Sequence, residues 1–443
     1  MADRQSLESA PTVVSDAAGP QPGNLKGNPA IAASPSYDTK AANATSPALH
    51  FPLNYFRVIW EFCVITVLLP YYFVKFALFP STRWRRSWTL LEATLMPAVK
   101  RIMAAMDLCG FKISSRDTDA EPSALGKWWM RVRYNGARFE WVEGLPDELV
   151  NGELADKEVK TRPRVGMFGW TREDAKGYGL IGLYLHGGAY THNSAHPSSS
   201  SSGIPATLFR RETRFSAMYS VEYRLLPHHP LPAALQDAAA AYLALLRRGI
   251  PGCRIVLIGD SSGGHLALAL TRWIRDMLDG GADDEQNPFR LQFRKPAGLV
   301  LLSPWSDPSH SYLGHTPQTY VPRSNSCDYL FEKGAFRLHL VTSLLGSHPQ
   351  EYVKSPYVSP GARDVQLGIL SGFPPVFVHY GTGERCQEEG ERLVANLRRD
   401  GVHVEVVVTD DTPHDLLLLA MIWRKEQVEQ IWTGALRFIE TLL

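Results

Sequence analysis

A serine between glycines stands near the middle of the chain, where Gly259, Ser261 and Gly263 form a Gly-x-Ser-x-Gly pattern. An apolar stretch over residues 255–258 precedes the pattern, and a second apolar stretch over residues 266–270 follows it. A sharp turn from a strand into a helix strains such a serine and projects its hydroxyl above the sheet. Glycines beside it let the two elements pack closely. The pattern therefore predicts a nucleophilic serine, although so short a motif needs support from elsewhere in the chain.

The support lies upstream, where an apolar strand over residues 180–185 ends in His-Gly-Gly-Ala at residues 186–189. A carbonyl attacked by the serine becomes an oxyanion, and backbone N–H groups must already face it. Losing one such donor raises the barrier by about 3 kcal/mol. Glycines let backbone amides approach where side chains would block them. We therefore expect the amides of Gly187, Gly188 and Ser262 to form an oxyanion hole.

These motifs resemble the His-Gly-Gly-Gly and Gly-Asp-Ser-Ala-Gly-Gly motifs of the hormone-sensitive-lipase-like α/β-hydrolases. Residues 221–237 resemble the Tyr-Arg-Leu-Ala-Pro-Glu segment of that family, and residues 301–307 and 355–360 also resemble family segments. The resemblance covers about residues 165–443. It implies an α/β-hydrolase fold and esterase activity.

Two positions depart from the family pattern. Ala189 stands at the fourth position of the first motif, a change between small residues that leaves the loop intact. His228 replaces the usual glutamate, which we expect to alter a surface contact more than the chemistry.

A histidine and a carboxylate follow the serine in the order expected for this fold. An alternating strand over residues 402–408 leads into His414, in a loop just before a helix, where an imidazole can reach Ser261. Glu384 follows the strand over residues 375–380, at the position where the family normally has aspartate. We predict that His414 is the base and Glu384 the acid that orients it.

Four other carboxylates compete with Glu384 for this role. Glu388 and Glu389 fall on a predicted helix over residues 388–399, and Asp410 and Asp411 stand too close to the histidine in sequence. Glu384 is therefore preferred.

The remaining histidines and the cysteines give no sign of a metal site. His265 lies in the helix after the serine and is predicted to be a packed core residue, while His228 and His229 lie in a proline-rich loop. The five cysteines are scattered and form no Cys-x-x-Cys pair, so we expect neither a zinc site nor a disulfide framework. No metal or organic cofactor is expected.

The serine motif also resembles the sequence around the nucleophile of chymotrypsin-like proteases. That all-β fold does not fit, because the chain alternates strands and helices, with strands predicted near residues 180, 215, 255, 297, 375 and 402. We expect an α/β fold with a mainly parallel sheet, helices on both faces and a lid.

Length and composition predict four regions in the 443 residues. Residues 1–50 are poor in large apolar side chains and are expected to be a disordered tail. A hydrophobic segment over 51–82, a linker and cap over 83–165, and a catalytic domain over 166–443 follow. The net charge is +1, so no nucleic-acid partner is expected.

The segment over residues 58–79 is long and apolar enough to cross a bilayer, although Pro70 interrupts it. An in-plane membrane helix and a cap helix over the active site are the alternatives. Basic residues follow the segment, which favours a cytosolic catalytic domain; they are Arg83, Arg85, Arg86, Lys100 and Arg101.

The stretches over residues 102–165 and 308–353 are predicted to form the lid. Trp128, Trp129 and Trp141 lie in the first of them, where aromatic side chains suit a bulky apolar substrate.

Together these features predict a membrane-associated serine esterase that acts on a small hydrophobic ester, with the endoplasmic reticulum as one candidate location. The resemblance extends to membrane-anchored fungal-type steryl acetyl hydrolases. Two alternatives stay open: a natural-product hydrolase, thioesterase or acyltransferase, and a non-catalytic ligand receptor on the same fold. The oligomeric state is left open.

Overall fold

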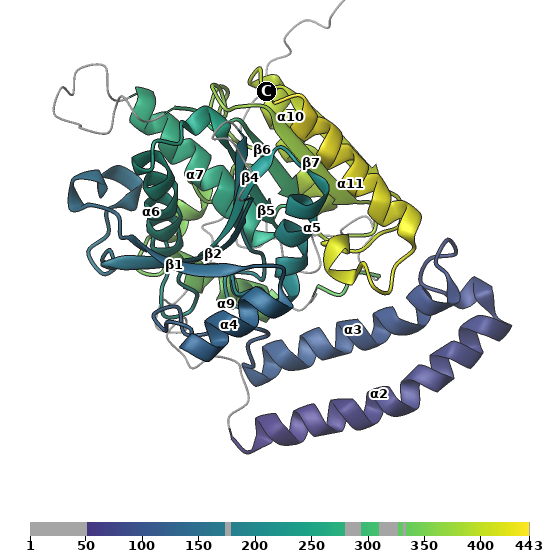
Figure 1. Cartoon of the computed structure of the whole chain (residues 1–443). Coiled ribbons are helices and arrows are strands. Elements are labelled where there is room, and N and C mark those ends of the chain that lie inside the picture. Colours follow the sequence, from purple (N-terminus) through teal and green to yellow (C-terminus); the bar gives the residue numbers. More distant parts are fainter. Residues whose placement is uncertain (1–50, 173–178, 280–293, 310–326, 331–333, 443) are drawn as a thin grey trace, which may run out of the picture. The chain divides into compact units, whose positions relative to one another are not determined.

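The computed structural model describes residues 51–172, 179–279, 294–309, 327–330 and 334–442, apart from the side chains of 334–338 (Figure 1). The predicted disordered tail therefore lies outside the described residues, as does part of the second predicted lid stretch. The strands of the sheet are β1 (Arg138–Glu143), β2 (Arg164–Thr171), β3 (Leu180–Leu185), β4 (Phe215–Glu222), β5 (Ile255–Asp260), β6 (Gly298–Leu302), β7 (Val376–Gly381) and β8 (Val404–Thr409).

The eight strands form one sheet in the order β1-β2-β4-β3-β5-β6-β7-β8. The pairs from β4 through β8 run parallel, whereas β1 with β2 and β2 with β4 run antiparallel. The six strands predicted from the sequence are β3 to β8. β1 begins at Arg138, so the sheet extends into the region predicted to be linker and cap.

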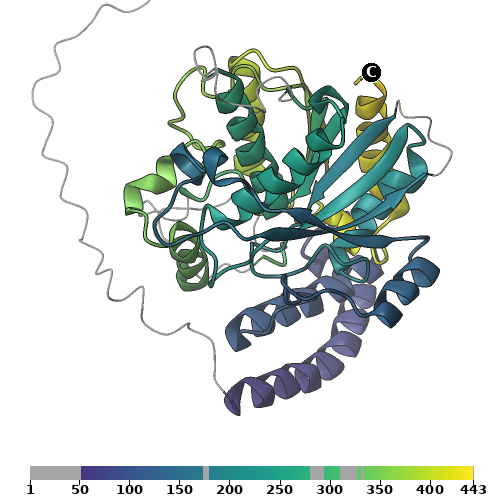
Figure 2. The ribbon, with the colours of Figure 1, turned by 60° about the vertical axis from the view of Figure 1, so that its left-hand side comes forward.

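Helices cover both faces of this sheet, as expected. The helices are α2 (Leu53–Leu78), α3 (Leu90–Cys109), α4 (Ala124–Arg133), α5 (Gly203–Arg211), α6 (Ala233–Arg247), α7 (Ser262–Asp279), α9 (Gly334–Leu345), α10 (Gln387–Arg399) and α11 (Lys425–Glu440). Figures 1 and 2 show α6 and α7 on one side of the sheet and α5 and α11 on the other. The core contacts place α10 in the layer of α6 and α7.

Neighbouring residues of the central strands point to opposite layers. In β3, Leu183 packs in the α6, α7 and α10 layer, whereas Tyr184 packs in the α5 and α11 layer; Leu257 and Ile258 of β5 divide in the same way. Because both faces are buried, these strands read as continuous apolar runs. This burial fixes the ends of the strands, from which the site is built.

The segment after α2 attaches the N-terminal helices to the C-terminal part of the chain. Thr89 and Glu92 form a capping box at the start of α3. Glu92 also accepts hydrogen bonds from Arg424, at 2.7 Å for the shortest pair. The Trp88 ring meets the Trp423 ring edge-on at 5.3 Å. Both contacts hold α3 against the start of α11.

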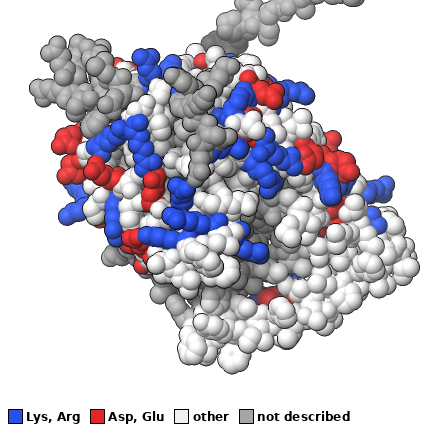
Figure 3. Space-filling view, in the orientation of Figure 1, with Lys and Arg blue, Asp and Glu red and all other residues white. Residues whose placement is uncertain are grey.

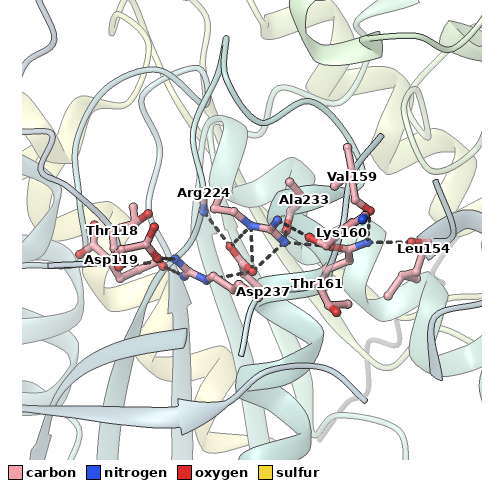
Figure 4. Close-up of polar contacts among 12 residues, drawn as sticks. Thr118, Asp119, Leu154, Val159, Lys160, Thr161, Arg224, Ala233 and Asp237 are labelled. Carbon is pink, nitrogen blue, oxygen red and sulfur yellow. Dashed lines mark hydrogen bonds and ion pairs between the residues drawn. The ribbon is translucent and has the colours of Figure 1, made fainter. Parts of the chain in front are cut away.

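A buried ion cluster occupies the segment that resembles the family around residues 221–237 (Figure 4). The Asp237 carboxylate forms ion pairs with the guanidinium group of Arg224 at 3.0 Å and with that of Arg162 at 3.2 Å. The same carboxylate accepts the backbone N–H of Arg224 at 2.9 Å. The cluster joins the loop after β4 to α6, so the likeness in this segment reflects the architecture of the fold and not the reaction.

Candidate active site

The turn between β5 and α7 has the geometry of a nucleophile elbow. Ser261 has a φ of +49°, a left-handed conformation that is strained for a residue with a side chain. A Cβ atom on Gly263 would lie 2.0 Å from the Leu185 carbonyl oxygen, and one on Gly259 would lie 2.3 Å from the Gly263 carbonyl oxygen. Only glycine at these two positions lets the helix, the turn and β3 approach so closely. The packing thus fixes the hydroxyl at the carboxyl end of β5.

The structure brings the predicted serine, histidine and glutamate into one hydrogen-bonded row. His414 Nε2 lies 2.8 Å from Ser261 Oγ, and His414 Nδ1 lies 3.0 Å from Glu384 Oε2. Ser261 follows β5, Glu384 follows β7 and His414 follows β8. The carboxyl ends of parallel strands meet at one edge of the sheet, so three distant segments converge there.

The acid and the base of this row are both buried. The backbone N–H of Gly381 donates to Glu384 Oε1 at 3.1 Å, which leaves Oε2 for the imidazole. Burial raises the pKa of Glu384, and its bond to His414 opposes that shift. Burial disfavours a charged His414, but Cys386 and Glu384 favour it and hold the pKa of His414 above its ordinary value. The pair therefore stabilises an imidazolium formed during a reaction.

The rival carboxylates lie elsewhere. Glu388 and Glu389 are on α10, as predicted. Glu388 faces Arg392 at 3.7 Å, and Glu389 accepts the backbone N–H of Asp307 at 3.1 Å. Asp411 accepts the Ser87 hydroxyl at 2.6 Å.

The loop after β3 differs in one respect from the predicted oxyanion hole. The Gly187 N–H donates to Asp260 Oδ1 at 3.0 Å, so this amide is already engaged. Gly188 and Ala189 line the cavity beside Ser261, with φ values of +112° and +54°. The sequence analysis did not assign Ala189 to the site, although its small side chain was the available signal.

Comparison with known proteins agrees with this geometry. A model of the α/β hydrolase fold family matches residues 182–418. The chain belongs to this family. An acetyl-hydrolase of Streptomyces hygroscopicus is 30% identical over 238 residues, which cover 53% of this chain and 67% of that protein. The carboxylesterase/phospholipase LipF of Mycobacterium tuberculosis is 30% identical over 247 residues, which cover 54% of this chain and 57% of that protein.

A solved structure shows the same fold. The crystal structure of an esterase/lipase from an uncultured bacterium matches 80% of this chain and 99% of its own, with a TM-score of 0.52 and 21% identity. The family and the esterase class expected from the sequence are thus confirmed. The chain spans two thirds of the first relative and little more than half of the second.

A pair of buried carboxyl groups lies behind the reacting row of this α/β-hydrolase. Asp260 precedes Ser261 and Asp415 follows His414, and the two buried carboxyl groups lie close enough for Asp260 to raise the pKa of Asp415. Burial raises the pKa of both, and for Asp415 the shift is large. Asp260 also accepts the Tyr184 hydroxyl. The pair links the elbow to the histidine loop, and sequence adjacency to the two catalytic candidates was the only signal for it.

Ser261 and His414 open onto a cavity of about 310 Å³. Most of its walls are apolar. The lining side chains other than those already described include Val99, Met103, Ile113, Trp305, Tyr329, Leu330, Leu340, Leu418 and Leu419. Such a wall favours a hydrophobic ligand with its polar group at the serine.

Both predicted lid stretches contribute to this cavity, but the aromatic residues singled out in the sequence do not form its wall. Met103 and Ile113 come from the first stretch, and Tyr329 and Leu340 from the second. The α4 tryptophans are about half exposed, at 54% for Trp128 and 52% for its neighbour.

Two other buried histidines, His265 and His186, do not line the cavity. His265 is fully buried, as predicted, between the Tyr190 hydroxyl at 2.6 Å and the Val358 carbonyl oxygen at 2.7 Å. Burial lowers the pKa of His265 and that of His186 to about 4. In the part of the chain that the structure describes, no three His, Cys, Asp or Glu side chains are grouped to hold a metal ion.

Proposed function

We propose that this protein is a serine carboxylic-ester hydrolase in which Ser261 is the nucleophile, His414 the general base and Glu384 its orienting acid. The observation that carries the proposal is the unbroken row from Ser261 Oγ to His414 Nε2 at 2.8 Å and from His414 Nδ1 to Glu384 at 3.0 Å. This is the arrangement that activates a hydroxyl for attack on an acyl carbon.

In the first half-reaction, Ser261 Oγ attacks the ester carbonyl while His414 Nε2 takes the hydroxyl proton. The developing oxyanion is bound by backbone amides, for which we propose Gly188, Ala189 and Ser262, since the Gly187 amide binds Asp260. His414 then gives its proton to the departing alcohol. Water repeats the sequence on the acyl-enzyme and restores the serine.

We propose a hydrophobic ester as the substrate. The wall formed by Met103, Tyr329 and Leu340 suits an apolar alcohol portion, because burying such a group is favourable at about 25 cal/mol per Å². One relative is named an acetyl-hydrolase, which supports a short acyl group. We therefore favour a deacetylase or esterase reaction on a bulky apolar alcohol.

We further propose that the protein associates with a membrane. Helix α2, from Leu53 to Leu78, is long and apolar enough to cross a bilayer by length and composition. A hydrophobic ester concentrates in lipid, so attachment to a membrane brings the enzyme to its substrate.

Labelling with a fluorophosphonate tests the proposed triad. We expect wild-type protein to be labelled, and Ser261→Ala and His414→Ala to abolish labelling. Ser371→Ala and His403→Ala change a serine and an exposed histidine outside the site and should label like wild type.

Folded wild-type protein that is not labelled would contradict the proposal and favour a ligand receptor. Labelled protein that transfers acyl groups to an added alcohol in preference to water would keep the triad and replace hydrolysis by acyl transfer.

A further inference from the structure

Helix α2 exposes its apolar side chains and covers its charged ones. The large apolar side chains of its outer face include Phe56 (65% exposed), Phe62 (74%), Val67 (70%) and Leu78 (67%). No Lys, Arg, Asp or Glu residue of α2 falls in the exposed class. Figure 3 shows a broad uncharged surface over α2 and α3, in contrast to the charged remainder of this face. Soluble monomers rarely expose so continuous an apolar surface.

Two of the three charged residues of α2 form an ion cluster with α3. Glu61 is only 4% exposed, and its carboxylate binds Arg57 on the same helix and Arg101 of α3, the latter at 2.6 Å. The helix is thus apolar on the outside and ionic on the inside. A helix facing water would have the reverse pattern.

The inner partner of α2 is itself attached to the enzyme. α3 is held by Glu92 to Arg424, and Trp88 donates its indole N–H to the Asp411 carbonyl oxygen at 2.6 Å. α3 also places Val99 and Met103 in the cavity wall. α2 therefore lies against a helix that is fixed to the enzyme, and it cannot cross a bilayer without breaking its ionic contacts to α3.

The chemistry of the exposed surface identifies its partner. The segment after α2 carries the exposed Arg86, and the partly exposed Lys75 lies in the last turn of the helix. Apolar and aromatic side chains beside basic groups match a leaflet that contains anionic lipids.

We propose that α2 lies in the plane of one membrane leaflet, with its outer face in lipid and its Glu61 cluster against α3. The cavity behind α3 then draws its ester from that leaflet; this second statement rests on the proposed function. The attachment is therefore monotopic, and the active site and α2 stay on the same side of the membrane.

Flotation of the full-length protein with vesicles tests the lipid surface. We expect wild-type protein to float with phosphatidylcholine vesicles that contain phosphatidylserine. Phe62→Glu combined with Phe73→Glu should lower the bound fraction at least tenfold. Leu367→Glu, a matched change at another exposed apolar residue (77% exposed), should not. Hydrolysis of a water-soluble short-chain ester should be equal in all three proteins, which separates failure of the surface from failure of the esterase.

Depth measurements distinguish an in-plane helix from a spanning one. Nitroxide labels at positions 56, 67 and 78, in protein with Cys63 and Cys253 changed to serine, should all report similar shallow depths of about 5–10 Å. A label at position 67 near the bilayer centre, with the other two at opposite surfaces, would overturn the proposal. Two results together would also overturn the proposal: wild-type protein that does not bind vesicles, and a wild-type dimer that dissociates in the Phe62→Glu, Phe73→Glu variant. The partner of the apolar surface would then be a second copy of this chain.

Discussion

Two buried polar clusters of this protein differ in their balance of charge. In the cluster around Asp237, one carboxylate meets two guanidinium groups, from Arg224 and Arg162. Around His414, the buried carboxyl groups outnumber the cationic partner; they are Glu384, Asp260, Asp415 and Asp328. Asp119 also pairs with Arg162, so the charges of the first cluster balance and its role is mainly structural. In the second, burial raises the pKa of Glu384, Asp260 and Asp415, which favours the neutral form of groups that would otherwise repel one another.

The largest effect on kcat is expected in the cluster around His414, where the reaction takes place. Ser261→Ala should lower kcat by about 10⁶-fold, because it removes the attacking oxygen. The double change with His414→Ala should cost little more, since the two act as one unit. Steady-state hydrolysis of a short-chain ester measures both, and additive losses would show that the two residues act independently.

Glu384→Gln should have the next largest effect, a fall in kcat of about 10³–10⁴-fold, because an amide no longer favours the imidazolium and its orientation. Glu384→Asp keeps the charge, but the shorter side chain places the carboxylate farther from His414. Its kcat should therefore lie between those of wild type and of the glutamine variant. Equal rates for the glutamine variant and wild type would assign the acid to another carboxyl group.

The pH profile refines the same pair. The base must be neutral to accept the serine proton, so kcat/KM should fall as pH falls through the pKa of His414. Because that pKa is raised, the midpoint should lie above the ordinary value of 6.5. Glu384→Gln removes a group that favours the charged form and should move the midpoint to lower pH. A midpoint that does not move would contradict the assigned pairing.

The structural cluster should respond in stability and not in rate. Asp237→Asn removes the carboxylate shared by the buried guanidinium groups of Arg224 and Arg162, although Arg162 keeps its pair with Asp119, and should lower the free energy of unfolding by about 3–5 kcal/mol. Glu140→Gln breaks the half-exposed pair with Arg248 and should cost less than about 1 kcal/mol. Urea unfolding compares the two, and kcat of the folded protein should stay near that of wild type in both.

The smallest effect tests the buried carboxyl pair. Asp415→Asn keeps the size of the side chain without a charge beside Asp260 and should keep kcat within about threefold, whereas Asp415→Ala opens a void next to that buried carboxyl and should lower kcat about 10-fold or more. If the asparagine variant is as impaired as the alanine variant, the carboxyl group of Asp415 matters and not its size.

The catalytic candidates were predictable because each follows a strand that the sequence reveals. Buried parallel strands are apolar runs, and their carboxyl ends converge, so Ser261, Glu384 and His414 could be placed together from order alone. β1 and β2 were both missed. The sequence of β1, Arg-Phe-Glu-Trp-Val-Glu, is half charged because the strand lies at the edge of the sheet, and no α-helix follows it before β2. β2 is buried, but it runs antiparallel to both of its neighbours and does not belong to the alternation of parallel strands and helices.

What the sequence did not reveal depends on contacts between distant segments. The Gly187 amide is engaged by Asp260, and α3 contributes to the cavity wall whereas the tryptophans of α4 do not. Neither contact leaves a periodic pattern. Likewise, the length and apolar composition of α2 predict that it can span a membrane. They do not show which face of the helix packs against α3, because that depends on the ion pair between Glu61 and Arg101 of α3.

The contacts that join the segment between α2 and α3 to the loop before His414 determine how a soluble form of the enzyme should be prepared. Ser87 and Trp88 hold Asp411, shortly before His414. A shortened chain that begins near Pro80 lacks α2 with its exposed apolar surface but keeps the contacts of Ser87 and Trp88 with Asp411. A chain that begins after Cys109 loses both these contacts and the α3 side chains that line the cavity. Its low activity would then be wrongly attributed to the absence of a membrane.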